Sequence, residues 1–574
     1  MIFLRSSLSL FRSPGACLLL LLFALPLPGN AYPSGESVAA TEKLPSLGLT
    51  GEIAYQLLLA EIAANRGNMA VAAGVYMELA RSTRDPRIAK RAAEMALYAR
   101  QTDGALDMAR LWASLDPEST PAKQTLIGLL LASRRLDEAA EQLRKLLALQ
   151  GDRLAESLPL LNRLLARYPD KAAVARLVVQ VTQPYEAMPE AHLARAQAYL
   201  AAAAETDALA EIDSAQRLRP DSEPAVLLKA QILQRKSNTQ AQETLRGYLE
   251  TYPKAREVRI GYARLLVGER QFESARREYQ TLLDADKSDR DAAYAIALLS
   301  LQLNDIDSAQ RELKRLLDVG FAEVNVVRLY LGQIAEEKQL PQEALQWYGM
   351  VTPGDQYLAA QVRAAALAVK QSGLDEGRAL LQKAGAASPK DAIAFLIAEA
   401  QLLTDAGRVA EAYELLDARL AAQPEEPQLL YESALLAEKL GRFETLETRL
   451  RLLIRIKPDH AHAYNALGYS LAERGQRLEE AQQLIETALS LAPDDAFILD
   501  SKGWVLYRRG DSAGALDVLQ KAYKQKPDPE IAAHLGEVLW ILGRREEAEK
   551  TWNAASQTDP RNEVLAATIK KFKP

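Results

Sequence analysis

The stretch Ala461–Pro560 contains one sequence pattern three times in succession. Its first copy reads NALGYSLAERGQRLEEAQQLIETALSLAP, from Asn465 to Pro493. Each copy has a glycine within an apolar segment, a second glycine, two alanines seven residues apart and a closing proline. The closing prolines, Pro493, Pro527 and Pro560, are 34 and 33 residues apart. Because Gly and Ala permit close helix contact and Pro ends a helix, each copy predicts a pair of antiparallel helices.

A period of about 34 residues with these landmarks resembles the tetratricopeptide repeat (TPR), whose helix pairs stack into a superhelical solenoid. Small residues recur near the start of each expected second helix, mostly at intervals of 33 to 35 residues. These positions, called rungs below, are Ala72, Ala105, Ala139, Ala208, Ala241, Ala275, Ala309, Ala344, Gly377, Ala412, Leu446, Ala481, Ala515 and Ala548. We therefore predict an all-α TPR solenoid of about fifteen helix hairpins with a C-terminal capping helix.

Two places depart from the period. The interval of 69 residues after Ala139 predicts an irregular unit, with Gly151–Pro169 and Asp170–Val181 as its two helices. Leu446 is larger than the other rungs, so we expect looser or shifted packing there. Gln183–Tyr185 and Val351–Gly354 contain proline and are the expected irregular joints.

The strength of the pattern divides the chain into segments. We expect a signal peptide over 1–31, a flexible lead-in over 32–50, degenerate TPR-like repeats over 51–183, central TPR-like repeats over 184–390, regular TPRs over 391–560 and a capping helix over 561–574. A cap is expected because the last unit of a solenoid would otherwise expose an apolar face. The alternative for this segment, which contains Lys570, Lys571 and Lys573, is a charged docking tail.

The first 31 residues have the features of a secretory signal peptide. Two arginines precede the apolar run Ala16–Leu25, and the small residues Gly29–Ala31 suit cleavage after Ala31. An uncleaved anchor is the alternative, although the run is short for a membrane span. The single cysteine, Cys17, lies at the start of the apolar run rather than after it, so no lipid anchor is predicted. We expect an exported protein, in the periplasm of a Gram-negative envelope or peripheral to a membrane.

Composition and motifs argue against an enzyme. The net charge of −6 and pI of about 5.7 give no support for nucleic-acid binding. Cleavage of the signal would leave no cysteine. Of the four histidines, His192, His460, His462 and His534, the close pair His460 and His462 has no organised set of carboxylates nearby. No GxSxG, P-loop or HExxH motif occurs. We therefore predict no catalytic residue, no cofactor and no metal site.

One face of the first helices in the last three units is rich in aromatic residues. First helices line the concave surface of such a solenoid. The candidate binding face comprises Tyr469, Asp500, Trp504, Tyr507, Glu537 and Trp540. Because Trp and Tyr are frequent binding anchors, we predict that it binds a protein or peptide. The alternative is that these side chains only pack against neighbouring helices. The acidic pair argues against the carboxylate clamp of some related repeat proteins, since it would repel a carboxylate.

The C-terminal segment reads NALGYSLAERGQRLEEAQQLIETALSLAPDDAFILDSKGWVLYRRG and then, after a gap, AAHLGEVLWILGRREEA. It resembles a family of exported proteobacterial TPR proteins, and LLLAEIAANRGNMAVAAGVYMELARSTRDPRIAKRAAEMALYAR is similar to the same family's opening unit. The resemblance implies a non-enzymatic adaptor that brings a periplasmic carboxyl-terminal processing protease together with peptidoglycan hydrolases. Such adaptors carry a lipobox cysteine, which this signal lacks. Related exported repeat proteins serve exopolysaccharide secretion, so a structural role in such an envelope assembly is the alternative.

Overall fold

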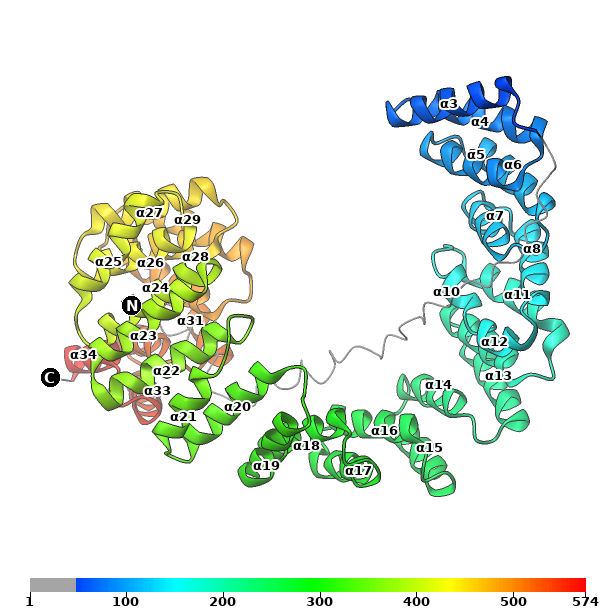
Figure 1. Cartoon of the computed structure of the whole chain (residues 1–574). Helices are drawn as coiled ribbons and strands as arrows, with labels where there is room; N and C mark the ends of the chain where they lie inside the picture. The colour runs from blue at the N-terminus through cyan, green and yellow to red at the C-terminus, as the bar shows by residue number, and fades with distance from the viewer. Residues whose placement is uncertain (1–47, 574) are drawn as a thin grey trace. The chain divides into compact units, whose positions relative to one another are not determined.

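The structure, a computed structural model, describes residues 48–573. These residues form 32 α-helices and three short 3-10 helices, with no strand between residues 48 and 573. The chain passes from one compact unit to another within α18, where the first ends at Leu299 and the second begins at Ser300. Within each unit successive helices lie side by side in chain order (Figure 1). The expected signal peptide and most of the expected lead-in lie outside the described residues.

The N-terminal unit consists mainly of helix hairpins. Its α-helices are α3 (Gly51–Asn65), α4 (Met69–Thr83), α5 (Pro86–Tyr98), α6 (Thr102–Leu115), α7 (Thr120–Ala132), α8 (Leu136–Ala148), α9 (Leu154–Ser157), α10 (Leu161–Leu165), α11 (Lys171–Thr182), α12 (Pro189–Ala201), α13 (Glu205–Leu218), α14 (Glu223–Gln234), α15 (Asn238–Thr251), α16 (Arg256–Gly268), α17 (Phe272–Ala285) and α18 (Arg290–Gln302).

The C-terminal unit continues the same arrangement. Its further helices are α19 (Ile306–Asp318), α20 (Val324–Glu337), α21 (Pro341–Gly349), α22 (Tyr357–Ser372), α23 (Leu374–Ala387), α24 (Ala392–Asp405), α25 (Val409–Ala422), α26 (Pro427–Lys439), α27 (Phe443–Ile456), α28 (Ala461–Glu473), α29 (Leu478–Leu491), α30 (Ala496–Arg508), α31 (Ser512–Gln525), α32 (Pro529–Ile541), α33 (Arg545–Thr558) and α34 (Glu563–Phe572). The predicted solenoid of about fifteen hairpins with a final capping helix is confirmed.

Local sequence signals fix the ends of the helices, as the hairpin of α30 and α31 illustrates. The Asp495 carboxylate caps α30 by accepting hydrogen bonds from the backbone N–H groups of Phe497 and Ile498 at 2.9 and 3.1 Å. Gly510 follows α30 with a φ of 94°, a conformation that favours glycine and turns the chain back. Asp511 then caps α31 through the Gly514 N–H at 2.8 Å.

Each rung is the fourth residue of the second helix in its hairpin, and all of the rungs are buried. The rungs are buried because the first helix of each hairpin approaches the second helix closely at this position. A Cβ on Gly468 of α28 would lie only 3.0 Å from the carbonyl oxygen of the rung Ala481. Leu446 is as fully buried as the alanine rungs, so its larger side chain brings no exposure.

The irregular unit between α8 and α12 differs in part from the prediction. Gly151–Pro169 is not one helix but a 3-10 turn, Gly151–Arg153, followed by the short helices α9 and α10. Pro159 explains the break, because it lacks an N–H group and its ring clashes with the preceding helical turn. The joint at Gln183–Tyr185 is a 3-10 helix, and Val351–Gly354 connects α21 to α22 without a helix, as predicted.

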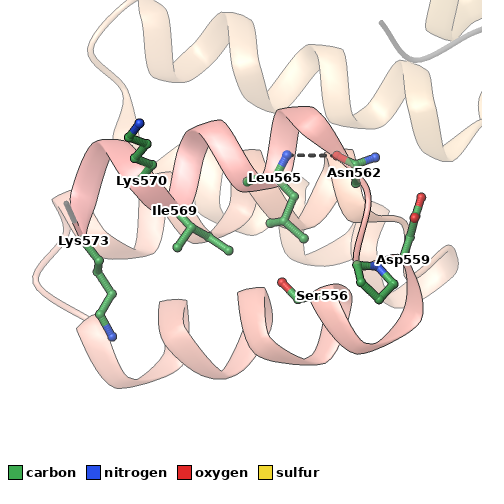
Figure 2. Close-up of a pocket in the computed structure, with 9 residues that line it drawn as sticks. Ser556, Asp559, Asn562, Leu565, Ile569, Lys570 and Lys573 are labelled. Carbon is green, nitrogen blue, oxygen red and sulfur yellow. Dashed lines mark hydrogen bonds between the residues drawn. The ribbon is translucent and has the colours of Figure 1, made fainter.

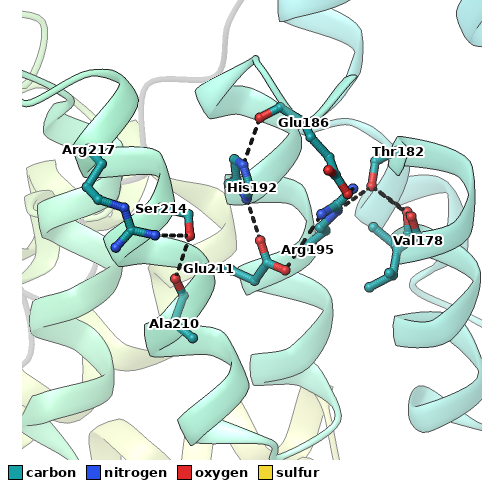
Figure 3. Close-up of polar contacts among 10 residues, drawn as sticks. Val178, Thr182, Glu186, His192, Arg195, Ala210, Glu211, Ser214 and Arg217 are labelled. Carbon is teal, nitrogen blue, oxygen red and sulfur yellow. Dashed lines mark hydrogen bonds and ion pairs between the residues drawn. The ribbon is translucent and has the colours of Figure 1, made fainter. Parts of the chain in front are cut away.

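A buried arginine ties this irregular unit to the next hairpin (Figure 3). Arg195 of α12 donates from Nε to the hydroxyl of Thr182 on α11 at 2.8 Å. Its Nη1 lies 3.8 Å from a carboxylate oxygen of Glu211 on α13, whose other oxygen lies 2.5 Å from Nδ1 of His192. The contacts therefore link three helices where the regular rung is missing.

Replacing Ala515 by leucine should destabilise the C-terminal unit by roughly 1–3 kcal/mol, because the rung is fully buried and its helix pair has no room for the larger side chain. Ala513→Leu, at an exposed position of the same helix, is the matched control. Urea unfolding followed by circular dichroism measures both. Equal unfolding midpoints for the two variants would contradict the packing described here.

Candidate protein-binding face

The six residues of the candidate binding face lie on three successive first helices of the C-terminal unit. Tyr469 is on α28, Asp500, Trp504 and Tyr507 are on α30, and Glu537 and Trp540 are on α32. Within each helix the relevant positions follow i, i+4 and i+7 spacing, which places them on one side of the helix. Contacts between α28, α30 and α32 then bring the three sides together.

The centre of this cluster is a buried pair formed by Asp500 and His534. Asp500 is 0% exposed, and its two carboxylate oxygens lie 2.9 and 3.0 Å from Nδ1 of His534. The Trp504 ring stacks on the imidazole with a centroid distance of 4.2 Å. On its other nitrogen, Nε2, the imidazole meets the Tyr469 hydroxyl at 3.4 Å.

The surroundings of His534 favour its protonated form. Burial opposes protonation, but the charge and hydrogen bond of Asp500 together with the charges of Glu473 and Glu530 outweigh it. The pKa of His534 is therefore raised above its ordinary value of 6.5. Burial also raises the pKa of Asp500. Both shifts mean that the folded pair holds its protons to higher pH than the unfolded chain does.

A second acidic residue of the face, Glu537, is also used within the chain. It is 5% exposed and accepts hydrogen bonds from the Tyr507 hydroxyl at 3.1 Å and from Lys571 of α34 at 2.9 Å. The Trp504 indole N–H donates to the carboxylate of Glu473 at 2.7 Å. The polar atoms of this face are thus bonded to one another and to the capping helix.

Trp540 belongs to an aromatic group at the end of the array. Its ring centroid lies 5.7 Å from that of Trp552 on α33 and 6.0 Å from that of Phe572 on α34. The Arg545 guanidinium lies 5.2 Å from the Trp540 ring centroid. The capping helix α34 therefore packs on the face as well as on the last hairpin.

The structure brings all six predicted residues into one contact network, but it buries part of the set. Asp500, Trp504 and Glu537 are buried, whereas Tyr469, Tyr507 and Trp540 are half-buried. The accessible surface of this set therefore belongs mainly to Tyr469, Tyr507 and Trp540.

Two further polar residues, one on α28 and one on α26, were not included in the candidate face from the sequence. Asn465 of α28 is 0% exposed, and neither atom of its amide group has a hydrogen-bond partner. Burial raises the pKa of Glu432 on α26 to about 7. The sequence could have indicated Asn465, because it lies one turn before Tyr469 and therefore on the same side of α28. Nothing in the sequence signalled the burial of Glu432.

A cavity of about 320 Å³ lies between α33 and the capping helix (Figure 2). Leu565 and Ile569 point from α34 toward the helix that carries Ser556, whereas Lys570 points away. The backbone N–H of Leu565 donates to the side chain of Asn562 at 2.9 Å, which caps α34. Among residues 48–573, no group of three or more His, Cys, Asp or Glu side chains is arranged to hold a metal ion.

Comparison with known proteins identifies the repeat. Models of the tetratricopeptide repeat match residues 233–299, 294–356, 461–495 and 501–563. A TPR repeat-containing protein of Pseudomonas aeruginosa is 33% identical over 558 residues, which cover 94% of this chain and 90% of that protein. The chain belongs to the tetratricopeptide repeat family. TPR arrays are generally non-catalytic scaffolds with extended concave surfaces for protein partners.

Solved TPR structures are also similar to this TPR protein. A TPR protein of Thermus thermophilus is 24% identical with a TM-score of 0.29, and the match covers 31% of this chain and 96% of that one. A TPR protein of Parabacteroides merdae is 17% identical with a TM-score of 0.35, covering 43% and 97% of the two chains. In the part of the TPR chain that the structure describes, no helix is long and apolar enough to cross a bilayer.

The Asp500–His534 pair should make the stability of the C-terminal unit depend on pH. A group whose pKa is raised by folding stabilises fully below its unfolded pKa, here about 6.5, and loses that stabilisation as the pH rises through the folded pKa. The loss amounts to about 1.4 kcal/mol for each unit by which folding raises the pKa. Urea unfolding at pH 6 and pH 9 should show this loss, and His534→Gln should reduce it. If the free energy of unfolding of His534→Gln changed with pH as much as that of the unsubstituted protein, the pH dependence would not arise from the Asp500–His534 pair.

Proposed function

We propose that this TPR protein is a non-enzymatic adaptor of the bacterial envelope that holds a periplasmic carboxyl-terminal processing protease together with cell-wall hydrolase substrates. The observation that carries the proposal is the series of helix hairpins from α3 to the capping helix, with one irregular unit between α8 and α12. Such an array offers a long surface and few places for a catalytic centre. The envelope location rests on the signal-like pattern of residues 1–31.

The adaptor role is supported by the extent of the similarity as well as by the fold. The similarity to the Pseudomonas relative covers 94% of this chain and 90% of that protein, so it is not confined to a few repeats. The choice of protease and hydrolases as partners comes from the resemblance of the first and last repeats to exported adaptors. A structural role in exopolysaccharide secretion is the competing function, and it predicts different partners.

We place one partner contact on the candidate binding face. Tyr469, Tyr507 and Trp540 are half-buried, and rings that are already packed on one side give contact area at little cost in conformational entropy. The internal bonds of Asp500 and Glu537 hold these rings in position before a partner arrives. Preorganisation of this kind lowers the entropic cost of binding.

Affinity purification of the tagged, full-length protein from envelope extract tests the adaptor role. We expect a carboxyl-terminal processing protease and peptidoglycan hydrolases to be retained, and the hydrolases to be degraded faster when the adaptor is added to the purified protease. Retention of polysaccharide synthase or export subunits instead would overturn the proposal in favour of the competing function.

Tyr507→Ala tests the location of the contact, because it removes a half-buried ring edge from the centre of the face. Partner affinity should fall by roughly 1–2 kcal/mol or more. Tyr98→Ala, which removes an exposed tyrosine from α5, is the matched control. Unchanged affinity in Tyr507→Ala, with helicity preserved, would contradict this placement while leaving the adaptor role to the purification experiment.

A further inference from the structure

The N-terminal unit has an exposed apolar surface on its first helix. Helix α3 packs on α4 at the outer end of this unit (Figure 1). Ala60 and Ala63 are buried on its inner side. On its outer side four large apolar side chains are between 38% and 64% exposed: Tyr55, Leu58, Leu59 and Ile62. Their i, i+3, i+4 and i+7 spacing places them in one row along the helix, called the α3 stripe below.

This stripe is unusual for the end of a repeat array. A terminal unit normally presents a polar outer face, because no further hairpin covers it. The other end of the chain meets this condition, since the exposed residues within α34 are small or charged: Glu563, Ala566, Ala567, Lys570 and Lys571. A helix that is apolar on both sides is normally covered on both sides. We therefore expect the α3 stripe to be covered in solution.

The two ends of the stripe have opposite charges. Glu52 lies in the first turn of α3, and Arg66 is the residue directly after its last turn. Both side chains are exposed. Glu52 lies six residues before Leu58, and Arg66 lies seven residues after Leu59, so the charges are at nearly equal distances from the centre of the stripe.

The apolar part of the stripe has the same symmetry. Tyr55 lies three residues before Leu58, and Ile62 lies three residues after Leu59. If a second α3 lay antiparallel to the first, with Leu58 opposite Leu59, then Tyr55 would lie opposite Ile62. The acidic end of each helix would then lie beside the basic end of the other. The stripe is therefore complementary to itself in both shape and charge.

Two other occupants match the stripe less well. Helices that lie in a membrane surface are rich in Lys and Arg, whereas α3 contains neither. The chain before α3 has no matching apolar row, because the segment between Pro33 and Pro45 contains only two large apolar residues, Val38 and Leu44. A second copy of the same helix supplies both the apolar side chains and the opposite charges.

We propose that the α3 stripe is an interface between two copies of this chain, in which the two α3 helices pack antiparallel about a two-fold axis near Leu58 and Leu59. In such an isologous contact Glu52 of each copy meets Arg66 of the other. Each α3 has 15 residues and is about 22 Å long, so the contact should bury less than the ~1,600 Å² of a standard interface. The dissociation constant should accordingly be roughly micromolar. The proposal does not depend on the adaptor function, because it concerns association of the chain with itself.

Sedimentation velocity of the exported, full-length protein from about 1 to 200 µM tests the proposal. The average mass should rise from that of one chain toward that of two. Leu58→Glu would bring two carboxylates together at the axis and should weaken dimerisation roughly tenfold or more. Leu218→Glu, which adds the same charge at an exposed position of α13, is the matched control and should dimerise normally.

Three results would overturn the proposal. The first is a protein that stays monomeric over the whole concentration range. The second is equal dimerisation of Leu58→Glu and Leu218→Glu, which would place the contact elsewhere. The third is binding of the monomer to vesicles of anionic phospholipid that Leu58→Glu abolishes, because the stripe would then face a membrane. Circular dichroism of each variant checks that its helices are intact.

Charge reversal tests the antiparallel arrangement itself. Glu52→Arg and Arg66→Glu each create two like-charged pairs in a dimer of identical copies, so each variant alone should dimerise roughly threefold or more weakly at low salt. A mixture of the two variants restores opposite charges at both ends of the stripe and should form mixed dimers in preference. If the mixture associated no better than either variant alone, the antiparallel interface would be wrong.

Discussion

The close approach of two helices at each rung is the constraint on which the rest of the structure depends. At Gly468 the distance from a hypothetical Cβ to the Ala481 carbonyl oxygen leaves no space for a side chain. At Gly536 the same space is taken by Trp552, whose Nε1 would lie 2.0 Å from a Cβ. The missing side chain of Gly536 therefore makes room for the ring on which Trp540 stacks. The absence of a side chain on these glycines therefore explains both the close backbone packing and the aromatic group at the end of the array.

Polar groups in the last three hairpins are organised by the same close packing. Each first helix contacts its own second helix and the neighbouring first helices, so polar side chains that lie between them become buried. Asp500 and His534 satisfy their buried polar atoms by pairing with each other. Glu537 does so by accepting hydrogen bonds from Tyr507 and from the capping helix. Asn465 has no such partner and leaves both atoms of its amide group without a hydrogen bond. A face held by internal bonds keeps its rings in fixed positions.

The fold was largely predictable because Gly, Ala and Pro mark the repeat most clearly where geometry demands them. In the regular hairpins the turn after each first helix contains a glycine with positive φ, such as Gly475 and Gly510, and Arg477 is the one non-glycine residue of residues 391–560 with positive φ. Earlier in the chain, Arg100, Arg134 and Arg270 adopt the same conformation, which explains why the pattern is degenerate there although the turn is conserved in shape. The helix expected over Gly151–Pro169 was wrong because the proline within it was given too little weight.

The candidate sites were less predictable. Helical spacing correctly gathered the aromatic residues of α28, α30 and α32, but spacing within one helix carries no information about partners on the next. His534 lies one residue away from the register of the face and still reaches Asp500, 34 residues earlier, because their helices are neighbours. The α3 stripe was not predicted either, because α3 is apolar on two sides and only the arrangement of the helices shows which side is exposed.

The constant place of the rung, fourth in every second helix of the regular hairpins, has an evolutionary consequence. Each hairpin offers the next one an equivalent surface, so an in-frame duplication of one gene segment of that period would extend the array without disturbing existing contacts. Arrays of different lengths can therefore arise from one ancestor by gain or loss of whole modules, while the first and last hairpins keep their own sequences.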